Sequence, residues 1–334
     1  MAEKVLEVRD LQTVFDTQLG KIHAVDGVSF DVARGEVLGL VGESGSGKTV
    51  TGFSILRLID KPGSIAGGQV RFQGRDLLSL SDREMRSMRG GRIAMIFQDP
   101  MMTLNPVLRI GTQMVEAILA HRSVSKAEAR HQARDALGAV GIPSPTERLD
   151  AYPHQLSGGM RQRVAIAIAM LNEPDLIIAD EPTTALDVTI QAQILYRMQK
   201  LCSERNTALI WITHDLSVVA QLADRICVMY GGRVIEQGRV ADVLTAPRHP
   251  YTRGLIDSVP AYSAPGERLK QIPGSIGSIM GLPQGCGFAP RCTRAVDACS
   301  KLPPATELEH GWSFRCFNPM PSTLNGSVKE LALG

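Results

Sequence analysis

The sequence predicts an α/β fold with a mainly parallel sheet, and three observations support this. Strand-like and helix-like runs alternate along residues 5–245. A glycine-rich turn, GESGSGKT at 42–49, lies between an apolar strand and a helix. A second buried strand, at 175–180, ends in Asp180 and is followed by Glu181, so two carboxylates stand at the end of an apolar run.

The predicted elements alternate along the chain according to their hydrophobic period. Apolar and polar residues alternate, or apolar residues run on, in the predicted strands at 5–11, 23–32, 36–42, 175–180, 208–215 and 226–238. Residues 69–77 and 92–97 are predicted as strands around a polar loop. Helices are predicted at 49–59 and within 106–142, where apolar residues recur at helical spacing among Ala, Glu, Arg and Gln.

Composition excludes several classes of protein. The 334 residues carry a net charge of only +2, whereas non-specific nucleic-acid binding relies on a large basic excess. No apolar run has the length of a signal peptide or of a membrane-spanning helix. We therefore expect a cytoplasmic chain that binds no nucleic acid and whose thiols are kept reduced.

The character of the sequence changes after about residue 245. Residues 246–321 are rich in Pro, Gly and Cys, and we expect a small appendage with few regular elements there. The last residues, 322–334, are expected to form a loose tail. The predicted organisation is thus a domain at 1–245, an extension at 246–321 and a flexible end.

The turn at 42–49 predicts a phosphate-binding loop. Gly42, Gly45 and Gly47 let the backbone curl so that successive N–H groups point at phosphate oxygens. Lys48 adds a positive charge near the β- and γ-phosphates, and Thr49 offers a hydroxyl to Mg²⁺. The expected ATP-binding set also includes the neighbouring residues Glu43, Ser44, Ser46 and Val50.

The carboxylates at 180–181 complete the predicted chemistry. The buried strand delivers both to the carboxyl end of the sheet, where the phosphates are expected. Asp180 can hold the Mg²⁺ shell, and Glu181 can act as general base toward an attacking water. Alone, this Asp-Glu-Pro run would be better explained as a helix start, but the phosphate loop favours the catalytic interpretation.

One further motif makes the resemblance specific. Residues 156–163 read LSGGMRQR, and together with GESGSGKT, IIADEP and ITHD they resemble the ATP-binding subunit of an ABC transporter. The match covers residues 5–245 with the motifs in the expected order. It implies a P-loop nucleotide-binding domain with a mixed sheet core, and a helical subdomain at about 106–165.

The resemblance also implies roles for individual residues. Gln98 matches the glutamine that senses Mg²⁺ and the attacking water, and His214 matches the histidine that contacts the γ-phosphate. Phe15 is the candidate aromatic residue for stacking on adenine, although it could equally be a core residue.

Four residues match the part of the family's site that acts on another subunit. Ser157, Gly158 and Gly159 match the signature that closes on the ATP of the opposite subunit. Asp187 matches the loop that runs between the two subunits. A lone chain is therefore expected to bind ATP but to hydrolyse it slowly.

Longer strings resemble the dipeptide/oligopeptide branch of the importers. They are IFQDPMMTLNP at 96–106, YPHQLSGGMRQR at 152–163, ADEPTTALDVTIQAQI at 179–194, APRHPYTRGL at 246–255, PGS at 273–275 and the cysteine-bearing end. The resemblance implies an ATPase that powers peptide import, peripheral on the cytoplasmic face of the inner membrane. It resembles the first of two related but different ATPases.

The implied partners are two membrane permease subunits, a second, non-identical ATPase and an extracytoplasmic substrate-binding protein. Two alternatives stay open: an importer of nickel or another small solute from the same branch, and a soluble ATPase switch or redox sensor.

The remaining question is the role of the late cysteines. Cys286, Cys292, Cys299 and Cys316 are spaced C-x5-C-x6-C-x16-C, while Cys202 and Cys227 are expected to be core thiols. A disulfide is unfavourable in a reducing compartment, zinc prefers tighter pairs, and the spacing matches no ferredoxin pattern. The resemblance implies a 4Fe–4S cluster, which we expect to be structural and without a part in hydrolysis. His249 and His310 are expected to be structural or exposed rather than ligands.

Overall fold

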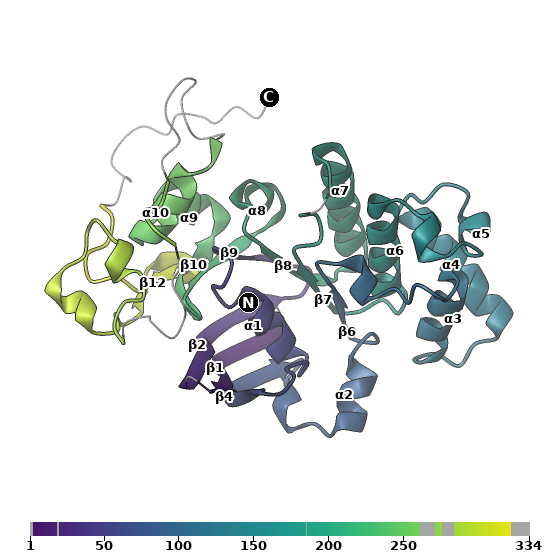
Figure 1. Cartoon of the computed structure of the whole chain (residues 1–334), viewed down its shortest axis with the longest axis horizontal. Coiled ribbons are helices and arrows are strands. Elements are labelled where there is room, and N and C mark those ends of the chain that lie inside the picture. The colour runs from purple at the N-terminus through teal and green to yellow at the C-terminus, as the bar shows by residue number, and fades with distance from the viewer. Residues whose placement is uncertain (1–2, 19, 185, 261–270, 276–283, 322–334) are drawn as a thin grey trace.

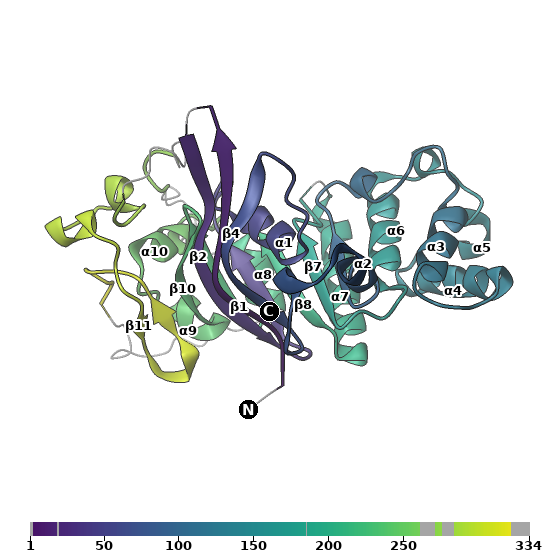
Figure 2. The same cartoon turned by 90° about the horizontal axis from the view of Figure 1, so that it is seen from below.

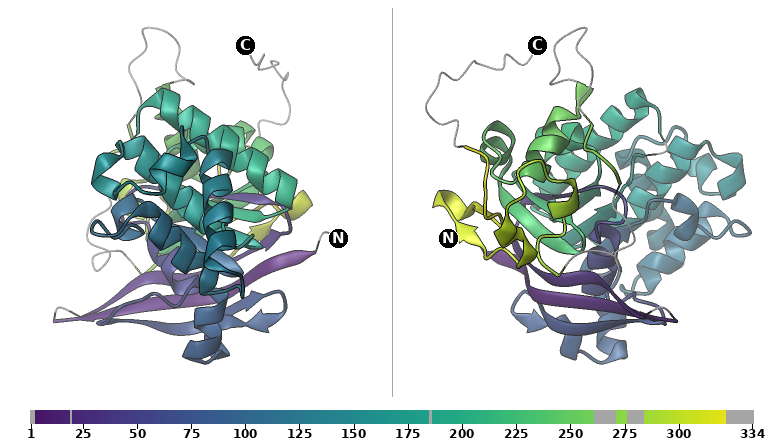
Figure 3. Two further views of the ribbon diagram at one scale, coloured as in Figure 1. Left: turned by 90° about the vertical axis from the view of Figure 1, so that its right-hand side faces the viewer. Right: turned by 60° about the vertical axis from the view of Figure 1, so that its left-hand side comes forward.

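The computed structural model describes residues 3–18, 20–184, 186–260, 271–275 and 284–321. A large mixed sheet crosses the middle of the molecule, with a helical part on one side and the C-terminal segment on the other (Figure 1). A second, antiparallel sheet packs below them in the first view of Figure 3. The P-loop fold predicted from the sequence, with a mixed sheet core and helices, is therefore confirmed.

The large sheet has the strand order β11-β12-β10-β9-β3-β8-β7-β6. The strands β9, β3, β8, β7 and β6 run parallel, whereas β10, β12 and β11 pair antiparallel. Their bounds are Val37–Val41 (β3), Ile93–Ile96 (β6), Leu176–Asp180 (β7), Ala208–Thr213 (β8), Arg225–Tyr230 (β9), Arg233–Arg239 (β10), Thr306–Glu307 (β11) and Ser313–Phe314 (β12).

The central strands form because their sequences are apolar on both faces. Every residue of β3, β7 and β8 is buried, as expected for parallel strands covered on both sides. The pairing of β3 with β8 and of β8 with β7 brings the carboxyl ends of the three strands to one edge. The residues that follow these strands therefore meet there.

The sequence between residues 226 and 238 differs from the single strand predicted for it. It forms the antiparallel hairpin β9–β10, which turns at Gly231 and Gly232, both with positive φ. The polar loop after residue 77 also contains a helix that was not predicted, α2 (Asp82–Met88). Ser81 caps α2 in a capping box with Glu84, a local signal that sequence analysis could have used.

The second sheet has the order β2-β1-β4-β5. Its strands are Lys4–Thr17 (β1), Gly20–Ala33 (β2), Gly63–Phe72 (β4) and Arg75–Asp76 (β5). The strand β4 begins six residues before the predicted start at 69, because pairing with β1 extends as far as Phe15–Gly63. Side chains of this sheet and of the large sheet form one of the two cores.

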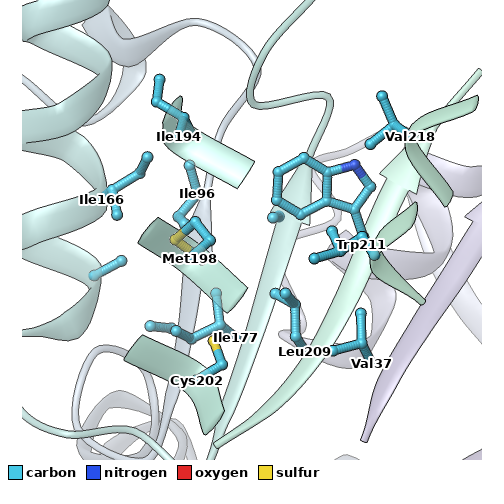
Figure 4. Packing of buried hydrophobic residues seen from close by; sticks show 14 of the residues in the cluster. Val37, Ile96, Ile166, Ile177, Ile194, Met198, Cys202, Leu209, Trp211 and Val218 are labelled. Atoms are coloured by element: carbon cyan, nitrogen blue, oxygen red, sulfur yellow. The ribbon is translucent and has the colours of Figure 1, made fainter. Parts of the chain in front are cut away.

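Helix α1 (Lys48–Ile55) packs between the two sheets, where Ile55 belongs to the core that they share, whereas the other helices lie mainly on the other face of the large sheet and in the helical part. They are Ile110–Leu119 (α3), Lys126–Ala139 (α4), Pro145–Arg148 (α5), Gly158–Met170 (α6), Val188–Arg205 (α7) and Leu216–Leu222 (α8). Figure 2 shows α3, α4, α5 and α6 grouped away from the C-terminal segment. Figure 4 shows the second core around Trp211, where α6 and α7 pack on the sheet.

Side chains of the C-terminal segment pack into the same hydrophobic core as buried strands of the large sheet. The segment continues from β10 through α9 (Val240–Thr245) and α10 (Pro250–Asp257), and β12 pairs with β10. Tyr251, Phe288 and Trp312 belong to the hydrophobic cluster that also contains the buried strands. A separate cysteine-rich domain is therefore not confirmed, and the predicted tail at 322–334 lies outside the described residues.

Cys202 and Cys227 are buried core thiols, as predicted from the sequence, in α7 and β9. In the part of the chain that the structure describes, no helix combines the length and apolar character needed to cross a membrane.

Candidate nucleotide site

The predicted phosphate loop borders a cavity of about 550 Å³ at the carboxyl edge of the large sheet. The loop between β3 and α1 and the start of α1 supply most of the wall, and the rest comes from residues that follow β6, β7 and β8 and from α10. The lining residues are Gly42, Glu43, Ser44, Gly45, Gly47, Lys48, Thr49, Val50, Gln98, Glu181, His214 and Leu255. Residues from four separate sequence motifs are thus brought to one cavity.

The loop curls because its glycines accept backbone angles that other residues avoid. Gly47 has φ of 97°, and a Cβ there would collide with the carbonyl oxygen of Ala24. Lys48 begins α1 and is buried, with its Nζ donating to the carbonyl oxygens of Gly42 at 2.8 Å and Glu43 at 2.9 Å. The loop therefore holds its single ammonium group on the inner wall of the curl.

The electrostatics of this wall suit a bound polyanion. Burial lowers the pKa of Lys48, and the nearby carboxylates of Glu181, Asp180 and Glu43 oppose that shift. A phosphate group would act in the same direction as these carboxylates and favour the charged ammonium.

Thr49 and Asp180 form a second pair behind the loop. The Thr49 hydroxyl donates to the Asp180 carboxylate at 2.9 Å, which links α1 to the end of β7. Burial raises the pKa of Asp180; the Thr49 hydrogen bond and Lys48 lower it, and Glu181 raises it further. A hydroxyl and a carboxylate side by side are hard oxygen donors, which fits the Mg²⁺ expected here.

Glu181 stands at the cavity with its backbone in the left-handed region, at φ of 43°. Its carboxylate accepts from Thr184 Oγ1 at 3.1 Å and lies 3.2 Å from Nδ1 of His214. Only 15% of its side chain is exposed, against 53% for His214. Gln98, which follows β6, lines the same cavity and is exposed. The geometry permits Glu181 to accept a proton from a water in the cavity.

The signature residues line a different cavity. Ser157, Gly158, Gly159 and Asp187 border a space of about 560 Å³ that shares no lining residue with the phosphate-loop cavity. Ser157 caps α6 by accepting from the Met160 N–H, and Asp187 caps α7 by accepting from the Ile190 N–H. The phosphate loop and the signature residues of this chain therefore border two separate cavities.

Three residues of the predicted ATP-binding set, Asp180, Ser46 and Phe15, do not line the phosphate-loop cavity. Ser46 is buried beneath the loop, where its hydroxyl accepts from Lys48 Nζ at 3.3 Å. Phe15 is half-buried on β1, with its ring against the backbone of Gly63. Its proposed stacking on adenine stays a prediction.

Sequence reasoning missed three residues that reach this site from the C-terminal segment. Leu255 of α10 lines the cavity, the Tyr251 hydroxyl accepts from the Glu43 N–H at 2.9 Å, and Arg291 contacts the Glu43 carboxylate at 2.8 Å. Tyr251 and Leu255 lie within the string at 246–255, but no local pattern indicates their contacts with the site. The contacts of Tyr251 and Arg291 with Glu43 each join positions more than 200 residues apart.

The four late cysteines lie in one partly buried region. The Cys286 N–H donates to the carbonyl oxygen of Cys299 at 3.0 Å. Burial raises the pKa of Cys316 to about 11, and the thiols of Cys286, Cys292 and Cys299 add to that shift. Nevertheless, among the described residues no group of three or more His, Cys, Asp or Glu side chains is arranged to hold a metal ion. The expected iron–sulfur cluster thus has no direct support.

The fold and the two cavities define an ATP-binding cassette ATPase, and comparisons with known proteins agree. The family described as ABC transporter matches residues 25–184, and the family described as oligopeptide/dipeptide transporter, C-terminal region, matches residues 235–299. The dimeric post-hydrolysis structure of the cassette MJ0796 bound to ADP and Pi is similar with a TM-score of 0.64 and 28% identity. The structural match covers 70% of this chain and 98% of the MJ0796 chain.

Curated relatives extend the similarity to nearly the whole chain. The oligopeptide transport ATP-binding protein OppD of Escherichia coli is 47% identical, covering 97% of this chain and 96% of its own length. The dipeptide transport ATP-binding protein DppD of Bacillus subtilis is 50% identical and covers 90% of each chain. The chain belongs to this family, the ATP-binding proteins of oligopeptide and dipeptide ABC transporters.

Proposed function

We propose that this chain is an ATPase subunit that powers the import of dipeptides or oligopeptides across the cytoplasmic membrane. One observation carries this proposal: the cavity that gathers the phosphate loop, Gln98, Glu181 and His214 at one sheet edge. The similarity to peptide-transport ATP-binding proteins along nearly the whole chain supports the peptide substrate.

The proposed chemistry is the hydrolysis of the terminal phosphate of ATP. Loop N–H groups and Lys48 would bind the phosphates, while Thr49, Asp180 and Gln98 would hold Mg²⁺, which neutralises developing charge. Glu181 would accept the proton of the attacking water, and its contact with His214 at 3.2 Å would orient the carboxylate. Lys48 and Thr49 begin a helix, and Glu181 and His214 directly follow buried strands, which limits the reorganisation needed for reaction.

The second cavity supports a dimeric arrangement. Ser157 and the N-terminus of α6, which is the positive end of the helix dipole, border that space. We propose that this surface contacts the ATP held by a second, non-identical ATPase, and that Asp187 lies between the two subunits. The other proposed partners are two permease subunits and an extracytoplasmic binding protein, with this chain peripheral on the cytoplasmic face of the inner membrane.

The Glu181→Gln variant tests the proposed mechanism. The amide keeps the shape of the side chain but cannot accept the proton, so ATP hydrolysis by the assembled transporter should fall by about a hundredfold or more. ATP binding should persist, and the ATP-bound dimer should accumulate in size-exclusion chromatography. Lys48→Ala is the matched control, because it should lose binding itself. Near-normal turnover of Glu181→Gln would exclude Glu181 as the base.

We also propose that Cys286, Cys292, Cys299 and Cys316 ligate a 4Fe–4S cluster. The donor set fits in chemistry, since four soft sulfur ligands lie within electrostatic range of one another. The surrounding segment has few regular elements, and a metal centre would stabilise it by cross-linking distant positions. The arrangement in the structure would have to tighten around the cluster.

Elemental analysis after purification without oxygen tests this second proposal. About four irons and four acid-labile sulfides per chain are expected for the cluster. One zinc without iron would replace the cluster by a zinc site. Neither metal, with four titratable thiols instead, would leave only reduced cysteines and refute the proposal. The Cys202→Ser variant is a control, because its buried core thiol should not alter the metal content.

A further inference from the structure

The phosphate loop is held from outside by the C-terminal segment. Both guanidinium nitrogens of Arg291 contact the Glu43 carboxylate, Nη1 with Oε2 at 2.8 Å and Nη2 with Oε1 at 3.1 Å. Glu43 is the second residue of the loop, whereas Arg291 directly precedes Cys292. This bidentate pair therefore joins the phosphate loop to the cysteine-bearing stretch near the end of the sequence.

Contacts other than the pair with Glu43 also hold the Arg291 side chain in place. Only 9% of that side chain is exposed, and the guanidinium lies 5.8 Å from the ring centres of both Tyr230 and Phe288. It also donates to the carbonyl oxygens of Pro273 at 2.7 Å and Gly274 at 3.1 Å. An exposed ion pair contributes little, but a largely buried, bidentate and pre-oriented one is expected to contribute measurably.

Tyr251 fixes the backbone of the same loop residue. Its hydroxyl accepts from the Glu43 N–H at 2.9 Å, and its ring is fully buried against Tyr230 and Phe288. One turn further along α10, Leu255 forms part of the cavity wall. Residues after 250 therefore contact both the backbone and the side chain of Glu43, and they form part of the cavity wall beside it.

The Glu43 carboxylate places a negative charge in the phosphate loop, and the guanidinium of Arg291 neutralises it. The loop has to bind a polyanion, and the Glu43 side chain is 28% exposed beside that site. Left unpaired, Glu43 would repel the phosphates and could compete for Lys48, whose pKa already responds to its charge.

We infer that Arg291 is a positioning residue of the nucleotide site, through which the C-terminal segment sets the affinity for ATP. Arg291 neutralises Glu43 and, with Tyr251, keeps the loop in its binding shape. This inference rests on the proposed binding of ATP at the same loop. It adds a role in nucleotide binding to a segment for which the sequence predicted a structural role only.

The test is a set of full-length variants whose ATP dissociation constants are measured by isothermal titration calorimetry with Mg²⁺. Arg291→Ala should weaken binding about tenfold, since an unpaired negative charge then faces the phosphates at partial screening. Glu43→Gln in the same chain should restore affinity to within about twofold of wild type, because nothing is left to neutralise. Glu43→Gln alone should bind ATP more tightly than wild type, because a negative charge beside the phosphates is removed while Arg291 stays.

Arg294→Ala is the matched control. Arg294 lies in the same segment and donates to Asn318 Oδ1 at 2.9 Å, away from Glu43, so its loss should leave ATP affinity unchanged. An Arg291→Ala chain that binds ATP like wild type would overturn the inference. So would a double variant as weak as Arg291→Ala, or an Arg294→Ala chain equally weakened, since either result would indicate general loss of the segment's structure. A wild-type chain that binds no ATP would instead refute the proposed function.

Discussion

At the residue scale, the junction between α10 and the large sheet depends on two buried ionisable side chains. The carboxylate of Glu236 accepts from the N–H groups of Arg248 and His249 and from Nε1 of Trp312. His249 caps α10 by accepting from the Tyr251 N–H at Nδ1, 3.0 Å away. The same cap therefore sets the position of Tyr251, which contacts the phosphate loop.

This buried histidine makes stability depend on pH. Burial lowers the pKa of His249 from 6.5 to about 3, so below pH 6.5 the unfolded chain binds a proton that the folded chain does not. The free energy of unfolding should therefore fall as the pH drops, by about 2 kcal/mol between pH 8 and pH 5 from this group.

The His249→Asn variant isolates that contribution. Asparagine can still cap the helix but does not titrate, so the variant should lose less stability between pH 8 and pH 5. Urea unfolding of both chains at the two pH values measures the difference. The raised pKa of Glu236, caused by burial, acts in the opposite direction but is common to both chains. Equal pH slopes would show that His249 is not responsible.

At the element scale, two neighbouring glycines at the N-terminus of α6 differ in how much room the chain's own atoms leave for a side chain. A Cβ added at Gly159 would lie 3.0 Å from the Ile190 side chain, so the chain's own packing crowds a larger residue at this position. A Cβ added at Gly158 would meet nothing within 4 Å. If Gly158 has to be glycine, the reason lies in a partner or a ligand.

Gly158→Ala should accordingly separate folding from function. The variant should unfold within about 0.5 kcal/mol of wild type and bind ATP normally, because the added methyl group meets only solvent in the single chain. ATPase activity of the assembled transporter should fall at least about tenfold, since the methyl group would intrude where the signature approaches the other subunit's nucleotide. Unfolding curves and steady-state hydrolysis test the two halves; full activity would argue against contact at Gly158.

At the scale of the whole molecule, one continuous sheet connects the chemistry to the C-terminal segment. The strand that ends at Asp180 and the strand that His214 follows lie in the same sheet as β10, with which β12 pairs. The helical part and the C-terminal segment flank this sheet on opposite sides (Figures 1 and 2). The phosphate-loop cavity and the signature cavity share no lining residue, which is compatible with the proposed arrangement of two subunits.

The sequence by itself determined the parts of this protein whose signals are local. Buried strands, the phosphate loop and Asp180-Glu181 could be predicted because hydrophobic period and short motifs act over a few residues. The hairpin β9–β10 was predicted as one strand, since both of its strands are apolar and only the Gly231-Gly232 turn separates them.

Only the tertiary structure decided how the C-terminal segment relates to the nucleotide site. The sequence predicts a small appendage with few regular elements there because its composition differs, and in the structure Tyr251 and Phe288 belong to the common core. The pair Arg291–Glu43 joins residues 248 positions apart. Such a contact follows from the path of the whole chain around the sheet, and the sequence around neither residue predicts it.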